Sequence, residues 1–142
     1  MAINHSIDDC WDWQVTVTFY SALHLIDAHV TRKTNEHYRS HDAIRQALNP
    51  YTHSPAALDE SGYIAYESLF KLSRRSRYLV SEKHNHKPAS TFLTYEKHLA
   101  RAIRHLDSLM SQIGPLYKIE FPEIKIKCKG LKEDELKVIR VT

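Results

Sequence analysis

Residues 9–31 read DCWDWQVTVTFYSALHLIDAHVT, and this stretch decides the fold. Apolar side chains recur in it at steps of three and four residues, which is the spacing of one face of an α-helix. They are Trp11, Val15, Phe19, Ala22, Ile26 and Val30. Residues 15–19 also alternate like a β-strand and are β-branched in part, but the alternation ends at Tyr20. The helical spacing continues to the end of the stretch, so we predict one long helix.

A second row with the same spacing lies nearly opposite the first on this helix. It consists of Trp13, Val17, Tyr20, His24, Asp27 and Thr31. The row mixes aromatic and polar side chains, which is not typical of a purely solvated face. We therefore predict that the helix lies in the middle of a bundle, with one face on the core and the other on a site or a partner.

The composition is that of a helical, single-domain protein. The chain has 142 residues, enough for one substantial core, and only 3 Gly and 5 Pro, which disfavours a fold with many turns. The net charge is +3 with neutral His, which permits nucleic-acid contact without requiring it, and the 10 His make the charge sensitive to mild acid.

Localisation is inferred from what the sequence lacks. Cys10 and Cys128 lie far apart and form no CxxC pattern, as expected for two ordinary thiols in a reduced compartment. The first ten residues do not resemble a signal peptide, and no apolar run approaches membrane-spanning length. We expect a soluble, cytoplasmic protein without membrane contact.

The rest of the chain divides into helices and breaks. Further helices are expected at about residues 38–48, 62–82 and 90–113, each with an apolar stripe at helical spacing. Ser6–Asp9 has the form of a capping box before the first helix, and Gly114-Pro115 predicts the end of the last one. The predicted fold class is an all-α bundle of four to five helices in residues 1–117. Residues 118–142 are predicted to be a short extended or helical tail that packs on the bundle or on a partner.

The segment SRRSRY, residues 73–78, holds the densest group of positive charge. Arg77 flanks the apolar stripe of its helix, and His84 follows seven residues later on the same face, roughly 10 Å along the axis. Arginine donates to phosphate oxygens in a fixed geometry, and histidine carries a proton near neutral pH. The alternative interpretation is a solvated basic surface with a capping His at a helix end.

The first helix and SRRSRY together carry a resemblance to a known family. The sequence WDWQVTVTFYSALHLIDAHV, a short second helix, SRRSRY on a third and a long amphipathic fourth helix resemble the HEPN superfamily over about residues 9–113. The closest likeness is to small stand-alone bacterial members. The resemblance implies a helical bundle, usually dimeric. It also implies a metal-independent ribonuclease site at the dimer interface, in which an Arg and a His promote attack of the RNA 2′-hydroxyl on the adjacent phosphate.

Two segments fit the family motif of an Arg and a His separated by four to six residues. Arg77 and His84 have six intervening residues, and Arg32 and His37 have four. The family motif lies late in the bundle, which favours Arg77 and His84 as the catalytic pair. The chain departs from the family pattern in one respect, because Tyr78 follows Arg77 where active members usually have a smaller polar residue. The expected substrate contacts are Tyr20, His24, Arg74 and Tyr78.

Other patterns have simpler interpretations. His37 and His41 have the spacing of a helical metal pair, but no second cluster completes a ligand set, so we expect neither metal nor cofactor. His24 either lines the cleft of Arg77, with Asp27 orienting its imidazole, or is a buried structural His. The basic back of the last helix, with Lys97, Arg101, Arg104 and His105, is interpreted as a solvated face or as an RNA-backbone track.

Three functions are consistent with these patterns. The first is a HEPN-type RNA endonuclease in a toxin–antitoxin or phage-defence system, acting as a homodimer beside a nucleotidyltransferase-like antitoxin. The second is a catalytically inactive HEPN dimer that binds nucleotide, RNA or a partner protein. The third is a structural dimer whose His content makes it pH-sensitive. The row that contains Trp13, Val17 and Tyr20 is the expected dimer surface.

Overall fold

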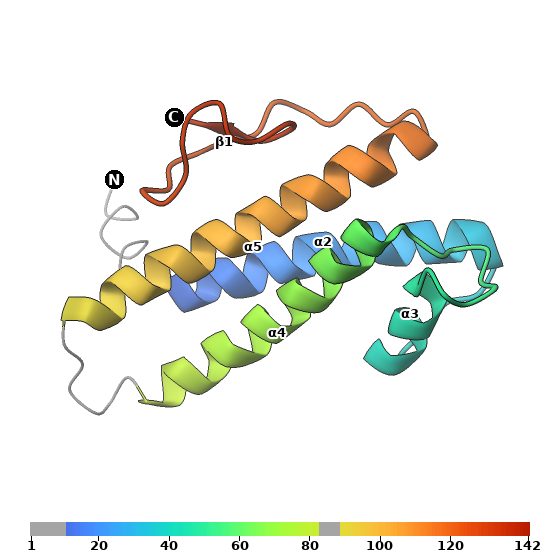
Figure 1. Ribbon diagram of the computed structural model, residues 1–142, viewed down its shortest axis with the longest axis horizontal. Helices are drawn as coiled ribbons and strands as arrows, with labels where there is room; N and C mark the ends of the chain where they lie inside the picture. Colours follow the sequence, from blue (N-terminus) through green and yellow to red (C-terminus); the bar gives the residue numbers. More distant parts are fainter. Residues whose placement is uncertain (1–10, 83–88) are drawn as a thin grey trace.

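The computed structural model describes the backbone of residues 11–82 and 89–142, with the side chains of residues 13–75 and 96–142. Three long helices lie side by side: α2 (Trp11–Thr34), α4 (Glu60–Glu82) and α5 (Ala89–Leu116). Helices α2 and α5 run in the same direction and α4 runs opposite to both (Figure 1). The short α3 (His41–Leu48) packs against α2 and α4. The predicted all-α bundle is confirmed.

The core stripe of α2 is buried as predicted. Val15, Phe19, Ala22, Ile26 and Val30 are all fully buried in the cluster that α2 forms with α3, α4 and α5. Burial of each large apolar side chain contributes about 1.5–3 kcal/mol, so this stripe is a main source of the stability of the bundle.

Helices α3 and α4 begin at side-chain caps. Ser40 precedes α3, and its Oγ accepts a hydrogen bond from the Ala43 amide at 3.1 Å, so α3 begins three residues later than the predicted start at residue 38. Asp59 precedes α4, and its Oδ1 accepts from the Gly62 amide at 2.8 Å. The α4 helix consequently begins at residue 60, two residues before the predicted start.

The predicted stop at Gly114-Pro115 is wrong by part of a turn. Helix α5 continues through Pro115 to Leu116, because a proline in the last turn removes only one backbone hydrogen bond. The chain turns instead at Lys118, whose φ is 54°, and the Ile119 amide donates to the Gly114 carbonyl at 2.9 Å. Gly114 permits a close approach here, since a Cβ at this position would lie 2.9 Å from the Phe121 ring and the ring would have to shift.

The C-terminal tail, residues 118–142, returns along α5 on the side away from α4 (Figure 1). It contains two two-residue strands, β1 (Lys125–Ile126) and β2 (Arg140–Val141), paired in parallel. Its apolar side chains form a second buried cluster with α5, made of Leu131, Ile139 and Val141 on Ala100, Ile103 and Met110. Of the alternatives for the segment after Gly130, the structure contains the strand. The tail therefore packs on the bundle.

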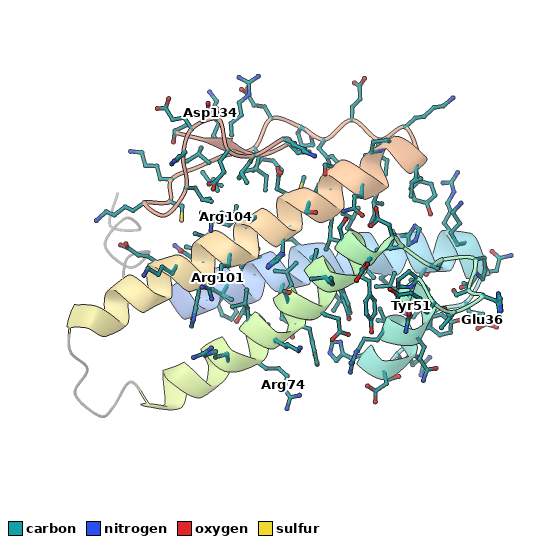
Figure 2. The ribbon with its side chains drawn as sticks, viewed as in Figure 1. Glu36, Tyr51, Arg74, Arg101, Arg104 and Asp134 are labelled. Atoms are coloured by element: carbon teal, nitrogen blue, oxygen red, sulfur yellow. The ribbon has the colours of Figure 1, made fainter. Side chains whose placement is uncertain are left out.

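A buried carboxylate attaches the tail to α5. Asp107 is only 4% exposed, and it accepts hydrogen bonds from three successive backbone amides, those of Lys137, Val138 and Ile139, at 2.8–2.9 Å. One turn earlier, the Arg104 guanidinium donates to Glu135 Oε1 at 3.1 Å and to the Gly130 carbonyl at 2.9 Å. Arg104 thus contacts the tail, as Figure 2 also shows, and the basic back of α5 is not one continuous solvated row.

Candidate functional site

The predicted catalytic pair can be placed only in part. Arg77 and Tyr78 lie in the last two turns of α4, and their side chains are outside the described residues. His84 also lies outside the described residues, as does the capping box predicted at Ser6–Asp9. The Arg77–His84 pair therefore stays a prediction, and the described residues around its position define its surroundings.

The two arginines that precede Arg77 point in different directions, because successive residues of an α-helix project to different sides. Arg74 is exposed, its guanidinium lies 5.7 Å from the centre of the Phe70 ring, and Figure 2 shows it projecting away from α5. Arg75 is near enough to His98 of α5 to affect the pKa of that residue. Only Arg75 of the two therefore adds positive charge between α4 and α5.

The sequence analysis did not single out His98, which is the most buried titratable group among the described side chains at this end of the bundle. Its side chain is 4% exposed, and burial lowers its pKa, with further lowering by the cations of Arg75 and Arg101. The only sequence signal was its place four residues before Ala102 of the apolar stripe. Burial and the two nearby guanidinium groups therefore all favour the neutral form of this imidazole.

His98 lies at the same level of the bundle as Arg75. Gln112 of α5 donates to Ser61 of α4 at 2.9 Å, which aligns these two antiparallel helices. His98 lies fourteen residues before Gln112 in α5, and Arg75 lies fourteen residues after Ser61 in α4. The two residues are therefore at the same level. Arg77 is two residues further, about 3 Å along the axis. The predicted catalytic arginine therefore belongs to the same basic end of the bundle.

His24 and Arg77 lie at different levels within one chain. Phe19 of α2 packs on Phe70 of α4, with ring centroids 5.9 Å apart. Arg77 is seven residues beyond Phe70 towards the Trp11 end of α2, and His24 is five residues beyond Phe19 in the opposite direction. The backbone positions therefore differ by about 18 Å along the helix axes. Within one chain, this separation of the backbones places His24 and Arg77 at different levels of the bundle.

His24 instead lines a polar hollow of about 350 Å³ between α2 and the start of α3, with Asp27, His37, Arg39 and Ser40 on its walls. Asp27 Oδ1 lies 3.3 Å from His37 Nδ1, so the carboxylate expected to orient His24 contacts a different imidazole. His24 itself is exposed, so it is not a buried structural His. Tyr20 is also largely exposed, one turn away on α2, and its ring contacts Phe19.

The histidines of the considered metal pair have separate partners. His37 contacts Asp27. The Nδ1 of His41 lies 3.3 Å from the Tyr66 hydroxyl, and its ring lies against that of Phe70 in a tilted arrangement with centroids 4.5 Å apart. Among the described side chains, no three His, Cys, Asp or Glu are grouped so that they could hold a metal ion.

The second Arg–His match also has separate partners. The Arg32 guanidinium lies 5.5 Å from the centre of the Tyr117 ring, at the α5 end, while His37 contacts Asp27. The surroundings of Arg32 and His37 therefore offer no shared phosphate site within the described part of one chain.

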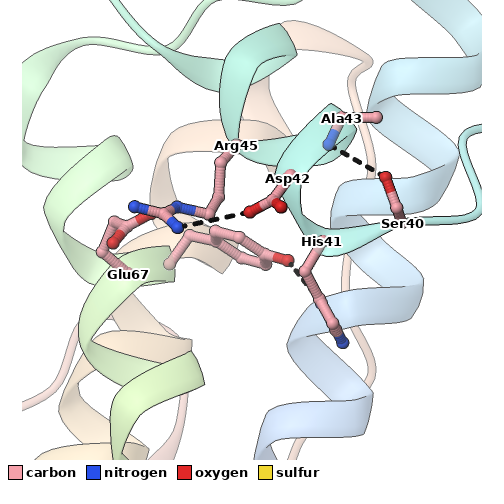
Figure 3. A network of polar contacts seen from close by, with 7 residues as sticks. Ser40, His41, Asp42, Ala43, Arg45 and Glu67 are labelled. Carbon is pink, nitrogen blue, oxygen red and sulfur yellow. Dashed lines mark hydrogen bonds and ion pairs between the residues drawn. The ribbon is translucent and has the colours of Figure 1, made fainter.

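A network beside His41 joins α3 to α4 (Figure 3). Arg45 forms an ion pair with Glu67 and lies 3.5 Å from Asp42, and the hydrogen bond to Glu67 raises the pKa of the arginine. Burial raises the pKa of Tyr66 to about 12, so its phenol stays protonated. These groups are paired with one another, and we assign them to the packing of α3.

A second hollow, which we call the tail groove, lies between α2, α5 and the C-terminal tail. Its volume is about 580 Å³, and its walls are apolar apart from Gln14, Thr18, Ser21 and Lys127. Trp13, 65% exposed, and Val17, 47% exposed, stand at its α2 side. The mixed row of α2 is thus largely open to solvent at these two positions. No pattern in the sequence indicates that the tail closes a groove beside it.

The comparisons with known proteins add no relative. No family model matches the chain, and neither a curated protein nor a solved structure matches it. None of the helices in the described part combines the length and the apolar character needed to cross a lipid bilayer. The function is therefore argued from the residues and their arrangement.

Proposed function

We propose that this protein is a HEPN-type, metal-independent RNA endonuclease, with Arg77 and His84 as its catalytic pair. The supporting observation is the position of Arg77 near the end of α4, at the level where the positive charges of Arg75 and Arg101 both act on His98. A scissile phosphate needs such a place, because its charge grows as the reaction proceeds.

The proposed cleavage reaction requires only protein side chains and the RNA itself. The RNA 2′-hydroxyl attacks the adjacent phosphorus, the bond to the 5′-oxygen breaks, and a 2′,3′-cyclic phosphate and a 5′-hydroxyl result. Arg77 binds the phosphate oxygens, and His84 acts as general acid or base for the proton that leaves the 2′-hydroxyl or reaches the 5′-oxygen. Arg74 and Tyr78 assist in binding the RNA.

The proposal includes a homodimer. The resemblance implies a site at a dimer interface, and the exposed Trp13, Val17 and Tyr20 supply an apolar surface for one. Because His24 lies about 18 Å from Arg77 along the bundle, His24 and Tyr20 contact substrate only where they face the site of the second subunit. A role in a toxin–antitoxin or defence system, with a nucleotidyltransferase-like antitoxin, belongs to the same proposal.

The test is RNA cleavage by purified protein in EDTA. Wild type should cleave, while Arg77→Ala and His84→Ala should each lower the rate by at least about a hundredfold, as expected for loss of a general acid–base or a phosphate-binding group. His53→Ala and Arg140→Ala are matched controls, because both side chains are exposed and neither residue belongs to the end of α4 that carries Arg77, and they should cleave like wild type. Wild-type rates in the Arg77→Ala, His84→Ala double variant would overturn the site.

The alternative is a catalytically inactive HEPN dimer that binds nucleotide, RNA or a partner protein. The exposed apolar row of α2 favours this second function, since a surface for association does not require chemistry. Tight nucleotide binding, or capture of a partner, without RNA cleavage by the wild-type protein would support it over the endonuclease.

A further inference from the structure

The tail groove is formed by three separate parts of the chain. The α5 side supplies Leu99, Ile103, Leu106 and Met110, and the tail covers them with Phe121, Ile124, Ile126 and Ile139. Neighbouring side chains of the same parts pack together in the second buried cluster. The groove is thus a space left between well-packed elements.

Bonds outside the groove hold the tail in place. The Asp107 carboxylate binds three tail amides, Arg104 binds Glu135 and the Gly130 carbonyl, and β1 pairs with β2. None of the side chains that make these bonds lines the groove. The hollow is therefore already shaped before a ligand enters, which lowers the entropic cost of binding.

The charge of the groove selects among apolar ligands. Among the described residues that line the groove, Lys127 is the one ionisable residue, and the α2 wall adds the polar groups of Gln14, Thr18 and Ser21. The hydroxyls of Thr18 and Ser21 donate to carbonyls of their own helix, so towards the groove they offer only acceptors. A ligand with an apolar body and a single anionic group at the Lys127 end matches this pattern.

The dimensions favour a flexible chain over a protein helix. An α-helix with its side chains is about 10 Å wide, so a space of about 580 Å³ would hold little more than one turn of it. The volume lies in the range of small-molecule pockets, about 300–1,000 Å³. A single alkyl chain can follow the whole apolar wall from Met110 towards Leu99.

We propose that the tail groove is a binding site for a single-chain amphiphile with an anionic headgroup, of the class of medium-chain carboxylic acids. The alkyl chain lies between α5 and the tail, and the carboxylate binds the Lys127 ammonium. None of the residues that line this groove is assigned to the proposed ribonuclease site, and Trp13 and Val17 are the two that the groove shares with the proposed dimer surface.

Trp13 at the edge of the groove provides the measurement. The chain has two Trp, so Trp11→Phe leaves Trp13 as the only indole reporter. Decanoate, decanol and decyltrimethylammonium are titrated into this protein, with circular dichroism as the check of folding. Decanoate should shift the Trp13 emission in a saturable way, and the cationic amphiphile should bind at least about tenfold more weakly because it meets a like charge.

Two pairs of variants locate the ligand. Lys127→Glu should weaken decanoate about tenfold and leave decanol unchanged, whereas Lys125→Glu, on the same exposed strand segment but outside the groove, should have little effect. Ser21→Phe should block both ligands by filling the α2 wall, whereas Ala28→Phe adds the same ring to an exposed position of α2 outside the groove.

Three results would overturn the proposal. The first is equal binding of decanoate by the Lys127→Glu and Lys125→Glu variants, and the second is equal binding by Ser21→Phe and Ala28→Phe. The third is absence of saturable decanoate binding by the Trp11→Phe protein. Together with that absence, a change of the native mass from dimer to monomer in Ser21→Phe would identify the groove as an interface between copies of the chain.

Discussion

Substitution of Asp107 should release the tail from the bundle. Its carboxylate is the acceptor for the amides of Lys137, Val138 and Ile139, and Ile139 is itself buried. In Asp107→Ala these amides lose their acceptor, and a buried donor left unpaired costs about 1–3 kcal/mol. The Lys137 amide is on an exposed residue and can bind water, so two amides carry the cost, about 2–6 kcal/mol in total.

Asp107→Asn removes the negative charge of this side chain and keeps its shape, so it tests the two contributions separately. An Asn Oδ1 can still accept from Val138 and Ile139, but its amide group then faces the Lys137 amide, donor to donor. We expect a smaller loss, about 1.5–3 kcal/mol, as for a hydrogen bond to a charged group. Asp134→Asn, which changes an exposed carboxylate of the same tail, is the matched control and should be within about 0.5 kcal/mol of wild type.

Amide hydrogen exchange is the decisive assay for this prediction, with denaturant unfolding for the total. Exchange at Val138 and Ile139 should accelerate in Asp107→Ala far more than exchange in the α2 core, because the tail opens locally. If Val138 and Ile139 exchanged at wild-type rates in Asp107→Ala, the carboxylate would not be what holds the tail.

The remaining predictions concern the core and the histidines. Burial lowers the pKa of His29, so stability should be full above its ordinary pKa of 6.5 and fall as the pH drops through the lowered pKa of the folded state. His29→Gln should therefore make the unfolding free energy less pH-dependent between about pH 5 and 7, and an unchanged slope would contradict this. Phe19→Ala, at a fully buried position, should cost about 3–5 kcal/mol in urea unfolding, and a loss below about 1 kcal/mol would contradict its place in the core. Gly130→Ala should destabilise the tail by about 1–3 kcal/mol, since its Cβ would lie 2.8 Å from the Ala100 Cβ. Adding Ala100→Gly should relieve that clash, and strictly additive losses in the double variant would argue against it.

The helices could be predicted because their signal is local. The residues of the stripe from Val15 to Val30 occupy successive turns of one segment, and all five described members of the stripe are fully buried. The errors in the predicted bounds are at helix ends, where a single residue determines the position at which the helix begins or ends. Asp59 caps α4 before the apolar pattern begins. Lys118, which has a positive φ, turns the chain after Pro115.

The tail could not be predicted for the opposite reason. Its structure depends on contacts across about thirty residues, such as Asp107 with Ile139, and strands of two residues leave no periodic pattern. The tail groove is formed by the same long-range contacts. The position of Lys127 beside it could therefore not be predicted from the sequence.

The candidate site could be predicted from the sequence only in part. That Arg74 and Arg75 diverge followed from helix geometry alone. The burial of His98 and the contact between Asp27 and His37 depend on how helices pack, which spacing within one helix does not specify. The pairing of Arg77 with His84 rests on the motif and on the position of Arg77 at the basic end of α4.

The chemistry of the RNA ends tests the central proposal most directly. Wild-type protein is incubated with RNA in EDTA, and the 3′ ends of the fragments are identified by mass spectrometry. The proposed reaction predicts 2′,3′-cyclic phosphate ends, lost in Arg77→Ala and in His84→Ala. Fragments with 3′-hydroxyl ends, or intact RNA with the wild-type protein, would contradict it.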